Sequence, residues 1–176
     1  MRIIKNFGIV AGLAAFAASG VAAQDQSTNR VAAKTDWSVF VEDNPTECWG
    51  VSTPKETVNS RDGRVVAVNR GQTLLMVFYR PSAGAKGQVA FTGGYPFKSG
   101  STVNMDISGN TFELFTEGEW AWPATTEDDS KIITAMKRGA DAVLSGQSGR
   151  GTDTKDTFSL LGFTAAVEDA AKRCGG

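Results

Sequence analysis

Thr102-Val103-Asn104-Met105-Asp106-Ile107 is the stretch of sequence that decides the fold class. Every second residue in it is apolar, and this alternation is typical of a β-strand with one face buried and the other in water. Ser108-Gly109-Asn110 then favours a turn, and the apolar segment Phe112-Glu113-Leu114-Phe115 follows it. Together these residues predict two antiparallel strands joined by a short turn.

Short segments of the same kind lie before this hairpin and are separated by turn-forming residues. Asp62-Gly63 is a pair that favours a tight hairpin turn. Leu74 to Tyr79 is continuously apolar, as expected of a strand that is covered on both faces. Other expected strands begin near Trp37, Cys48, Val65 and Val89. Many short strands at this spacing predict a mainly β domain, an antiparallel β-sandwich or barrel-like fold.

Two segments depart from the β pattern and predict short helices, one of them C-terminal. Thr126-Glu127-Asp128-Asp129 resembles a helix start with a hydroxyl cap, and Gly139 resembles a helix end. The three acidic residues also permit a metal-site interpretation, but carboxylates at the positive end of a helix dipole are the more common arrangement. The second segment predicts one buried helical stripe, formed by Phe163, Val167, Ala170 and Cys174.

The N-terminal residues have the pattern of a cleavable secretory signal. Arg2 and Lys5 are basic, an apolar run follows them, and small residues precede Gln24. We therefore expect a signal peptide at residues 1–23, with cleavage between Ala23 and Gln24. A transmembrane anchor is the alternative, but the apolar run is shorter than the roughly 20 residues that a spanning helix needs.

The rest of the chain is expected to form one mildly acidic domain. Residues 24–35 are polar and lack periodicity, so we expect a flexible lead-in before a domain at residues 36–174. The chain has 18 Lys and Arg against 19 Asp and Glu, and removal of the signal leaves a net charge of about −3. Nucleic-acid binding usually needs a basic surface, so we expect no nucleic-acid partner. Nor does any second apolar stretch predict a transmembrane segment in the mature protein.

The two cysteines, Cys48 and Cys174, predict a disulfide, because an isolated pair in an exported protein is usually bridged. Two free thiols or a metal site are the alternatives. With no histidine in the chain, two cysteines leave a zinc ion short of its usual four nitrogen or sulfur ligands. We therefore expect no metal site and no cofactor. Since Cys174 lies on the expected buried stripe, the bridge would attach the last helix to an early strand.

The absence of histidine also removes the catalytic arrangements that pair serine or cysteine with histidine. Gly146-Gln147-Ser148-Gly149-Arg150 comes near the G-x-S-x-G pattern of a nucleophile elbow, but Arg150 stands where glycine is required. We interpret residues 146–151 as a polar, flexible loop and assign no catalytic residue. No phosphate-binding loop or dinucleotide-binding fingerprint occurs in the sequence.

Four aromatic residues give the clearest binding hypothesis. Trp120 and Trp122 lie two positions apart, hence on one face of a strand, and Tyr95 and Phe97 lie at an expected turn. Grouped on the surface, the four side chains would form a contact surface for a sugar, a peptide or another protein. The alternative, which is the more common arrangement, is that the two indoles fill the core or cover the first helix.

Three segments together resemble a known family. Asp36-Trp37-Ser38-Val39-Phe40 precedes Cys48, Gly94-Tyr95-Pro96-Phe97 leads to Gly100-Ser101-Thr102-Val103, and Phe158-Ser159-Leu160-Leu161-Gly162-Phe163-Thr164-Ala165-Ala166 closes the domain. Over residues 36–174 the chain resembles the invasion-associated locus B family of bacterial proteins. The resemblance implies a β-sandwich-like fold in a small periplasmic or envelope protein of proteobacteria, with a role in host-cell entry in pathogenic members. The chain lacks the additional cysteines that other members often carry, and the family has no accepted catalytic residues to transfer.

The residues and the resemblance together predict an exported, periplasmic protein that binds a protein or an envelope component without catalysis. One alternative is a hydrolase or lyase that acts on envelope glycans or peptides through paired carboxylates. A cleft with two acidic side chains about 5–10 Å apart would favour it. The other alternative is a chaperone-like protein that adds a strand to a partner, and a long free edge strand would favour that one.

Overall fold

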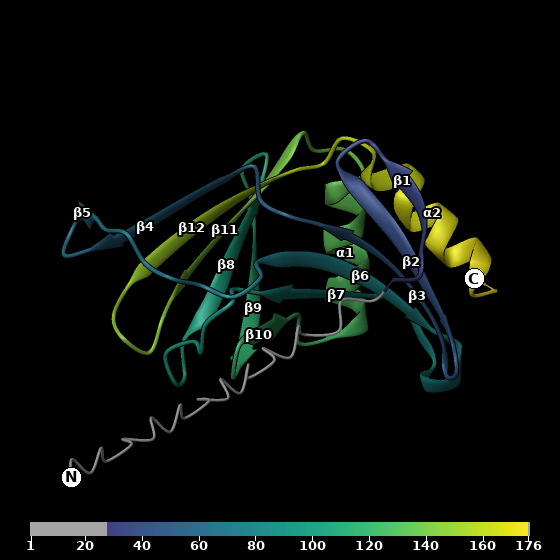
Figure 1. Cartoon of the computed structure of the whole chain (residues 1–176), viewed down its shortest axis with the longest axis horizontal. Helices are drawn as coiled ribbons and strands as arrows, with labels where there is room; N and C mark the ends of the chain where they lie inside the picture. The colour runs from purple at the N-terminus through teal and green to yellow at the C-terminus, as the bar shows by residue number, and fades with distance from the viewer. Residues whose placement is uncertain (1–27, 176) are drawn as a thin grey trace, which may run out of the picture.

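The computed structural model describes residues 28–175 of the 176-residue chain. The expected signal peptide and its cleavage site between Ala23 and Gln24 lie outside the described residues. Within residues 28–175, no helix is both long and apolar enough to cross a membrane. The described part of the chain contains twelve strands, two α-helices and one short 3-10 helix, η1 (Pro81–Ala83), and the second α-helix is C-terminal (Figure 1).

All twelve strands belong to one antiparallel sheet, in the order β1-β2-β3-β6-β7-β10-β9-β8-β11-β12-β4-β5. β1 and β5 are its free edges, so the sheet does not close into a barrel. The predicted mainly β, antiparallel fold with two short helices is confirmed. The strands are β1 (Arg30–Lys34), β2 (Trp37–Asp43), β3 (Thr46–Ser52), β4 (Glu56–Arg61), β5 (Arg64–Val65), β6 (Leu74–Arg80), β7 (Ala85–Thr92), β8 (Thr102–Ile107), β9 (Asn110–Glu117), β10 (Trp120–Trp122), β11 (Asp141–Gln147) and β12 (Asp153–Ser159).

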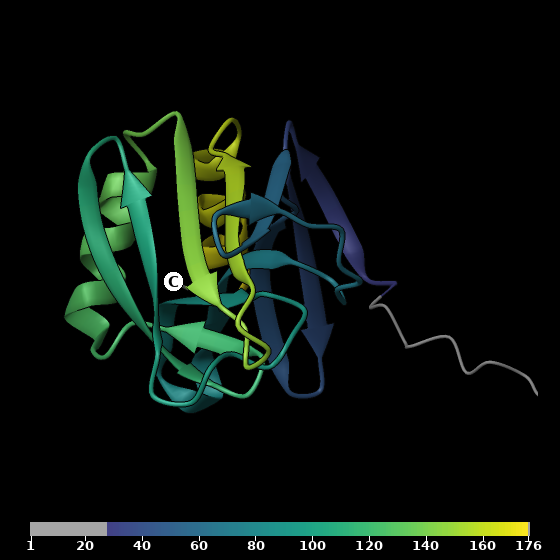
Figure 2. The same ribbon diagram turned by 90° about the vertical axis from the view of Figure 1, so that its left-hand side faces the viewer.

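The sheet bends so that its two halves face each other. β6 and β7 run across the molecule at a steep angle to β8, β11 and β12 (Figures 1 and 2). The inner faces meet at Phe91 of β7, whose ring lies edge-on to Phe158 of β12 with 6.1 Å between the ring centroids. Both rings are fully buried. The arrangement is therefore sandwich-like, with one apolar core between the two halves of a single sheet.

The C-terminal helix α2 (Phe163–Arg173) packs on β2 and β3. Phe163 meets Trp37 of β2 at 4.9 Å between ring centroids. At the end of the helix, Cys174 forms the expected disulfide with Cys48 of β3. The predicted buried stripe is confirmed, since the buried residues of the helix include Phe163, Val167 and Ala170. The ring contact and the bridge hold the last helix on the first strands of the domain.

The first helix, α1 (Thr126–Met136), begins where the acidic segment predicted a helix start. Thr125 is the N-cap, and its hydroxyl accepts a hydrogen bond from the Asp128 N–H. Asp129 turns inward, and its Oδ1 accepts the Val89 N–H of β7 at 2.8 Å. β10 ends before it reaches Val89, so the carboxylate replaces a missing strand partner. Among residues 28–175, no group of three or more His, Cys, Asp or Glu is placed to hold a metal ion.

Both predicted hairpin turns are confirmed. Asp62-Gly63 joins β4 to β5, and Ser108-Gly109 joins β8 to β9. All four residues have positive φ, which is the backbone conformation of a two-residue turn that matches the twist of the strands.

Two segments differ from the prediction. Arg30–Lys34, assigned to the flexible lead-in of residues 24–35, forms β1 and pairs with β2. Its strand conformation comes from this pairing, which a short segment without regular alternation does not reveal. The strand expected to begin near Val65 ends there instead, since β5 is Arg64–Val65, and the valines that follow, Val66 and Val68, lie in a loop.

Candidate functional site

A cleft of about 600 Å³ opens where the β4–β5 hairpin, the loop after it and the β11–β12 turn meet. Arginines and hydroxyl-bearing side chains make up about half of its lining. These residues include Arg61, Arg70, Arg150, Tyr95, Ser148, Thr152 and Thr154, together with one acidic residue, Glu119.

A buried ion pair between Arg70 and Asp156 holds one side of the cleft. Nη1 and Nη2 of Arg70 donate to Oδ1 and Oδ2 of Asp156 at 2.9 and 2.7 Å. The Asp156 side chain is fully buried, and that of Arg70 is 8% exposed. Nε of Arg70 also donates to the Gly93 carbonyl at 2.9 Å, and the Thr57 hydroxyl donates to Oδ1 of Asp156 at 2.8 Å. Because these partners use most of the donors and acceptors of the pair, it anchors the loop and offers a ligand little free charge.

Tyr95 and Phe97 lie in the core beside this pair. The Tyr95 ring is 5.0 Å from the Arg70 guanidinium carbon, and its hydroxyl shares a hydrogen bond with Oγ1 of Thr154 at 2.5 Å. Phe97 meets Tyr95 at 4.9 Å between ring centroids, and both rings are buried. Burial raises the pKa of the Tyr95 hydroxyl. The hypothesis of an exposed group that includes Tyr95 and Phe97 is therefore wrong for these two side chains, because their segment turns inward between the strands.

The turn between β11 and β12 forms the rim of the cleft. Residues 146–151 were expected to be a flexible loop, but only the last four form a turn, and this turn is tied by hydrogen bonds. The Ser148 N–H donates to the Thr152 carbonyl at 2.9 Å, and the Thr152 N–H donates to the Ser148 hydroxyl at 3.1 Å. Nη2 of Arg61 donates to the Thr152 hydroxyl at 2.7 Å. Arg150, at the tip of the turn, is exposed.

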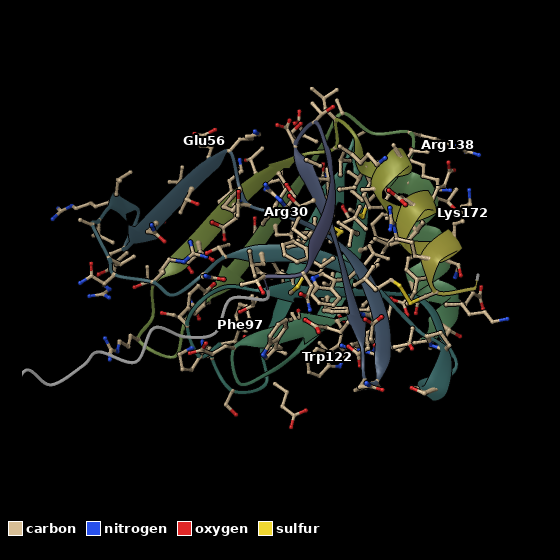
Figure 3. All side chains as sticks on the ribbon, turned by 45° about the vertical axis from the view of Figure 1, so that its right-hand side comes forward. Arg30, Glu56, Phe97, Trp122, Arg138 and Lys172 are labelled. Carbon is tan, nitrogen blue, oxygen red and sulfur yellow. A yellow bond between two sulfur atoms is a disulfide. The ribbon has the colours of Figure 1, made fainter. Side chains whose placement is uncertain are left out.

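Phe115, Trp120 and Trp122 form a second surface on the outer face of the sheet, here called the aromatic patch. Trp122 lies opposite Phe115 in the pairing of β10 with β9, and Trp120 lies opposite Glu117. Phe115 is 49% exposed and Trp120 is 40% exposed. Trp122, which is labelled in Figure 3, is half-buried. Glu113 and Glu117 lie two residues before and after Phe115, hence on the same face of β9. Negative charges therefore border the exposed rings.

The segment around Trp37 at the start of the domain contacts the closing segment, which contains Ser159 and Gly162. The Trp37 indole Nε1 donates to the Ser159 carbonyl at 3.0 Å. Gly162 has a φ of +89° and lies so close to the Lys34 carbonyl that a Cβ atom would overlap it. Glycine is required there for both reasons. The two segments thus form one structural unit that sets the start of α2.

A family model of the invasion associated locus B (IalB) protein matches residues 37–171. The chain belongs to the invasion-associated locus B family. The crystal structure of invasion associated protein B from Bartonella henselae is similar in fold, with a TM-score of 0.56 and 14% sequence identity. The similarity covers 82% of this chain and 98% of that one. No curated protein matches the chain. The family resemblance expected from the three sequence segments is confirmed.

In this member of the invasion-associated locus B family, the cleft is equipped to hold a ligand by charge and hydrogen bonding. Glu119 is the one acidic side chain that lines it among the described residues, and Asp156 is occupied by Arg70. A glycosidase-type site needs two carboxylates about 5–10 Å apart, so the cleft gives no support to that mechanism. The hydroxyl of Ser148 accepts a backbone N–H rather than facing a general base.

Sequence interpretation did not find the buried pair that organises the cleft of this family member. Arg70 and Asp156 are 86 positions apart, so no motif spacing connects them. One signal was present in β12, where Thr154, Asp156 and Phe158 occupy the alternate, buried positions. A carboxylate at a core-facing position of a strand needs a buried partner, although the pattern does not say which residue supplies it.

Proposed function

We propose that this member of the invasion-associated locus B family is an exported envelope protein that acts by binding. Its partner is a protein segment that combines apolar and positively charged side chains, and this segment docks on the aromatic patch. The observation that carries the proposal is the exposed Phe115 ring, beside Trp120 and Trp122, with a glutamate on each side of it along β9.

The chemistry of the aromatic patch favours a cationic partner. Aromatic side chains contribute most of the binding energy in many protein interfaces. A Lys or Arg side chain placed over an indole gains about 0.5–2 kcal/mol from the ring quadrupole. Glu113 and Glu117 attract the same cations and repel an acidic partner, so they select the partner by charge.

Export is supported by three independent observations. Residues 1–23 have the sequence pattern of a secretory signal. The bridge between Cys48 and Cys174 fits an oxidising compartment, where disulfides persist. The family resemblance implies periplasmic or envelope proteins. We propose that the mature protein begins at Gln24 and is located in the periplasm.

Peptide binding to the mature protein tests the proposed surface. Fluorescence anisotropy compares a labelled peptide that alternates lysine with leucine and a matched peptide that alternates glutamate with leucine. We expect the lysine peptide to bind, and its affinity to fall about tenfold or more in the variant F115S/W120S. The matched control is V65S, which changes an apolar side chain that is 79% exposed at the far edge of the sheet. Equal binding of the two peptides, or unchanged binding by F115S/W120S, contradicts the proposal.

Cell fractionation followed by N-terminal mass analysis tests export. We expect a periplasmic chain that begins at Gln24 and has no thiol that alkylates without prior reduction. A cytoplasmic chain that retains residues 1–23 and has two alkylatable cysteines contradicts export.

Neither alternative function has an observation that favours it. The outermost strands, β1 and β5, are five and two residues long, so the described sheet offers no long free edge strand for strand addition. The cleft has one acidic lining residue among those described, so it does not favour a carboxylate-based hydrolase.

A further inference from the structure

We propose that the cleft is a binding site for a small organic anion, whose carboxylate or phosphate group is held by Arg61 and Arg150. This site is separate from the aromatic patch and uses different residues.

The first argument for an anion is the balance of charges among the side chains that line the cleft. Asp156 neutralises Arg70, so Arg70 adds no free charge to the lining. Neither Arg61 nor Arg150 forms an ion pair with another described residue, whereas Arg80 and Arg173 each pair with an acidic neighbour. Two uncompensated guanidinium groups therefore line one cleft, against a single carboxylate. Guanidinium groups recognise carboxylates and phosphates by paired hydrogen bonds, which makes an anion the matching ligand.

The backbone turn at the rim of the cleft is fixed before any ligand arrives. Thr152, which accepts a hydrogen bond from Arg61, is only 4% exposed and is tied to Ser148 through two hydrogen bonds. The same turn is held from the opposite side, because the Gly149 N–H donates to the Pro96 carbonyl at 3.0 Å. A preformed backbone loses little conformational entropy on binding, so the ligand has to order only the exposed Arg150 side chain.

The size and the other lining groups narrow the ligand class. A volume of about 600 Å³ lies within the usual range for small-molecule sites. Asn69 and Glu119 add an amide and a carboxylate to the lining, and both can bond hydroxyl groups. The site therefore fits an organic anion of about the size of a sugar, such as a sugar acid or a sugar phosphate.

Isothermal titration calorimetry on the mature protein tests the inference with three probes: glucuronate, glucose 6-phosphate and glucose. We expect at least one of the two anions to bind with a Kd of about 1 mM or tighter, and glucose to bind at least tenfold more weakly. Binding of glucuronate alone identifies the carboxylate as the recognised group, and binding of glucose 6-phosphate alone identifies the phosphate. The affinity should also fall as salt is added, because the site is open to solvent.

Single variants then locate the site. R61Q and R150Q should each weaken anion binding about tenfold. The control is R138Q, which changes an exposed arginine on the helix side of the molecule (Figure 3) and should leave anion binding unchanged. R150Q removes no hydrogen bond to a described residue, so its fold is preserved and its result is decisive. F115S/W120S should bind the anion like the wild type, which separates this site from the aromatic patch. The inference is overturned if neither anion binds at about 10 mM, if glucose binds equally well, or if R61Q/R150Q binds like the wild type.

Discussion

Breaking the buried ion pair between Arg70 and Asp156 should destabilise this protein strongly. The perturbation is a pair of single substitutions, R70M and D156L, together with the double variant R70M/D156L. In each single variant one charge remains in a site where the Asp156 side chain is fully buried and the Arg70 side chain is 8% exposed. Removing one partner of such a pair costs about 3–5 kcal/mol, because the other charge is left without compensation.

The double variant separates charge pairing from packing. Apolar side chains of similar volume avoid the desolvation of both charges, so R70M/D156L should lose less stability than either single variant. A remaining loss of about 1–3 kcal/mol is expected, since the Gly93 carbonyl and the Thr57 hydroxyl lose hydrogen bonds.

Urea unfolding followed by tryptophan fluorescence measures the free energy of unfolding for each variant. The control is K131M, which breaks the exposed pair between Lys131 and Glu127 and should cost less than about 1 kcal/mol. The reasoning is refuted if either single variant loses less than about 1 kcal/mol, or if the loss in the double variant equals the sum of the two.

Three further predictions concern other parts of the fold. Replacing Cys48 and Cys174 by serine opens a loop of 126 residues and should lower the free energy of unfolding by up to about 5 kcal/mol, measured by urea titration; an unchanged value contradicts the role of the bridge. Burial raises the pKa of Asp129, so its protonation favours the folded state as the pH falls from neutral towards the usual Asp value of 3.8. D129N lacks this gain, so its stability relative to the wild type should fall with acidification in thermal unfolding at a series of pH values, and a constant difference contradicts the assignment. G162A should lose more stability than G118A, because both positions have positive φ but only a Cβ at 162 meets the Lys34 carbonyl; equal losses contradict the overlap.

The parts of the fold that the sequence predicts correctly are those set by neighbouring residues. Asp62-Gly63 and Ser108-Gly109 fix their own backbone, so both hairpins follow from a few residues. The stripe from Phe163 to Cys174 shows which side of α2 is buried. With only Cys48 available as a partner, that stripe also indicated the disulfide.

The parts that the sequence does not predict depend on contacts between distant residues. Arg30–Lys34 becomes a strand only because β2 lies beside it. Tyr95 and Phe97 lie in a sequence segment that is typical of an exposed turn, yet this segment passes between strands. There the Phe97 N–H donates to the Gly118 carbonyl, and Phe97 forms an isolated β-bridge with Ser148. Only the two indoles were correctly placed on one strand face.

The sequence did not predict the cleft, for a related reason. Arg61 ends β4, Arg70 lies in the loop between β5 and β6, and Arg150 lies in the turn between β11 and β12, so no single motif contains them. The pairing of β12 with β4 and with β11 brings these segments together. Strand order in the sheet therefore creates the site, and local sequence patterns do not determine strand order.

Photo-cross-linking in living cells tests most directly the claim that the aromatic patch binds a basic segment in the envelope. A photoreactive phenylalanine analogue replaces Phe115 in one strain and the exposed Arg138 in a control strain, and mass spectrometry maps each cross-linked peptide. The account predicts a cross-link from position 115 to an envelope protein, at a segment where Lys or Arg lies beside apolar residues, and no such cross-link from position 138. Absence of a cross-link from position 115, the same product from both positions, or attachment to an acidic segment would contradict it.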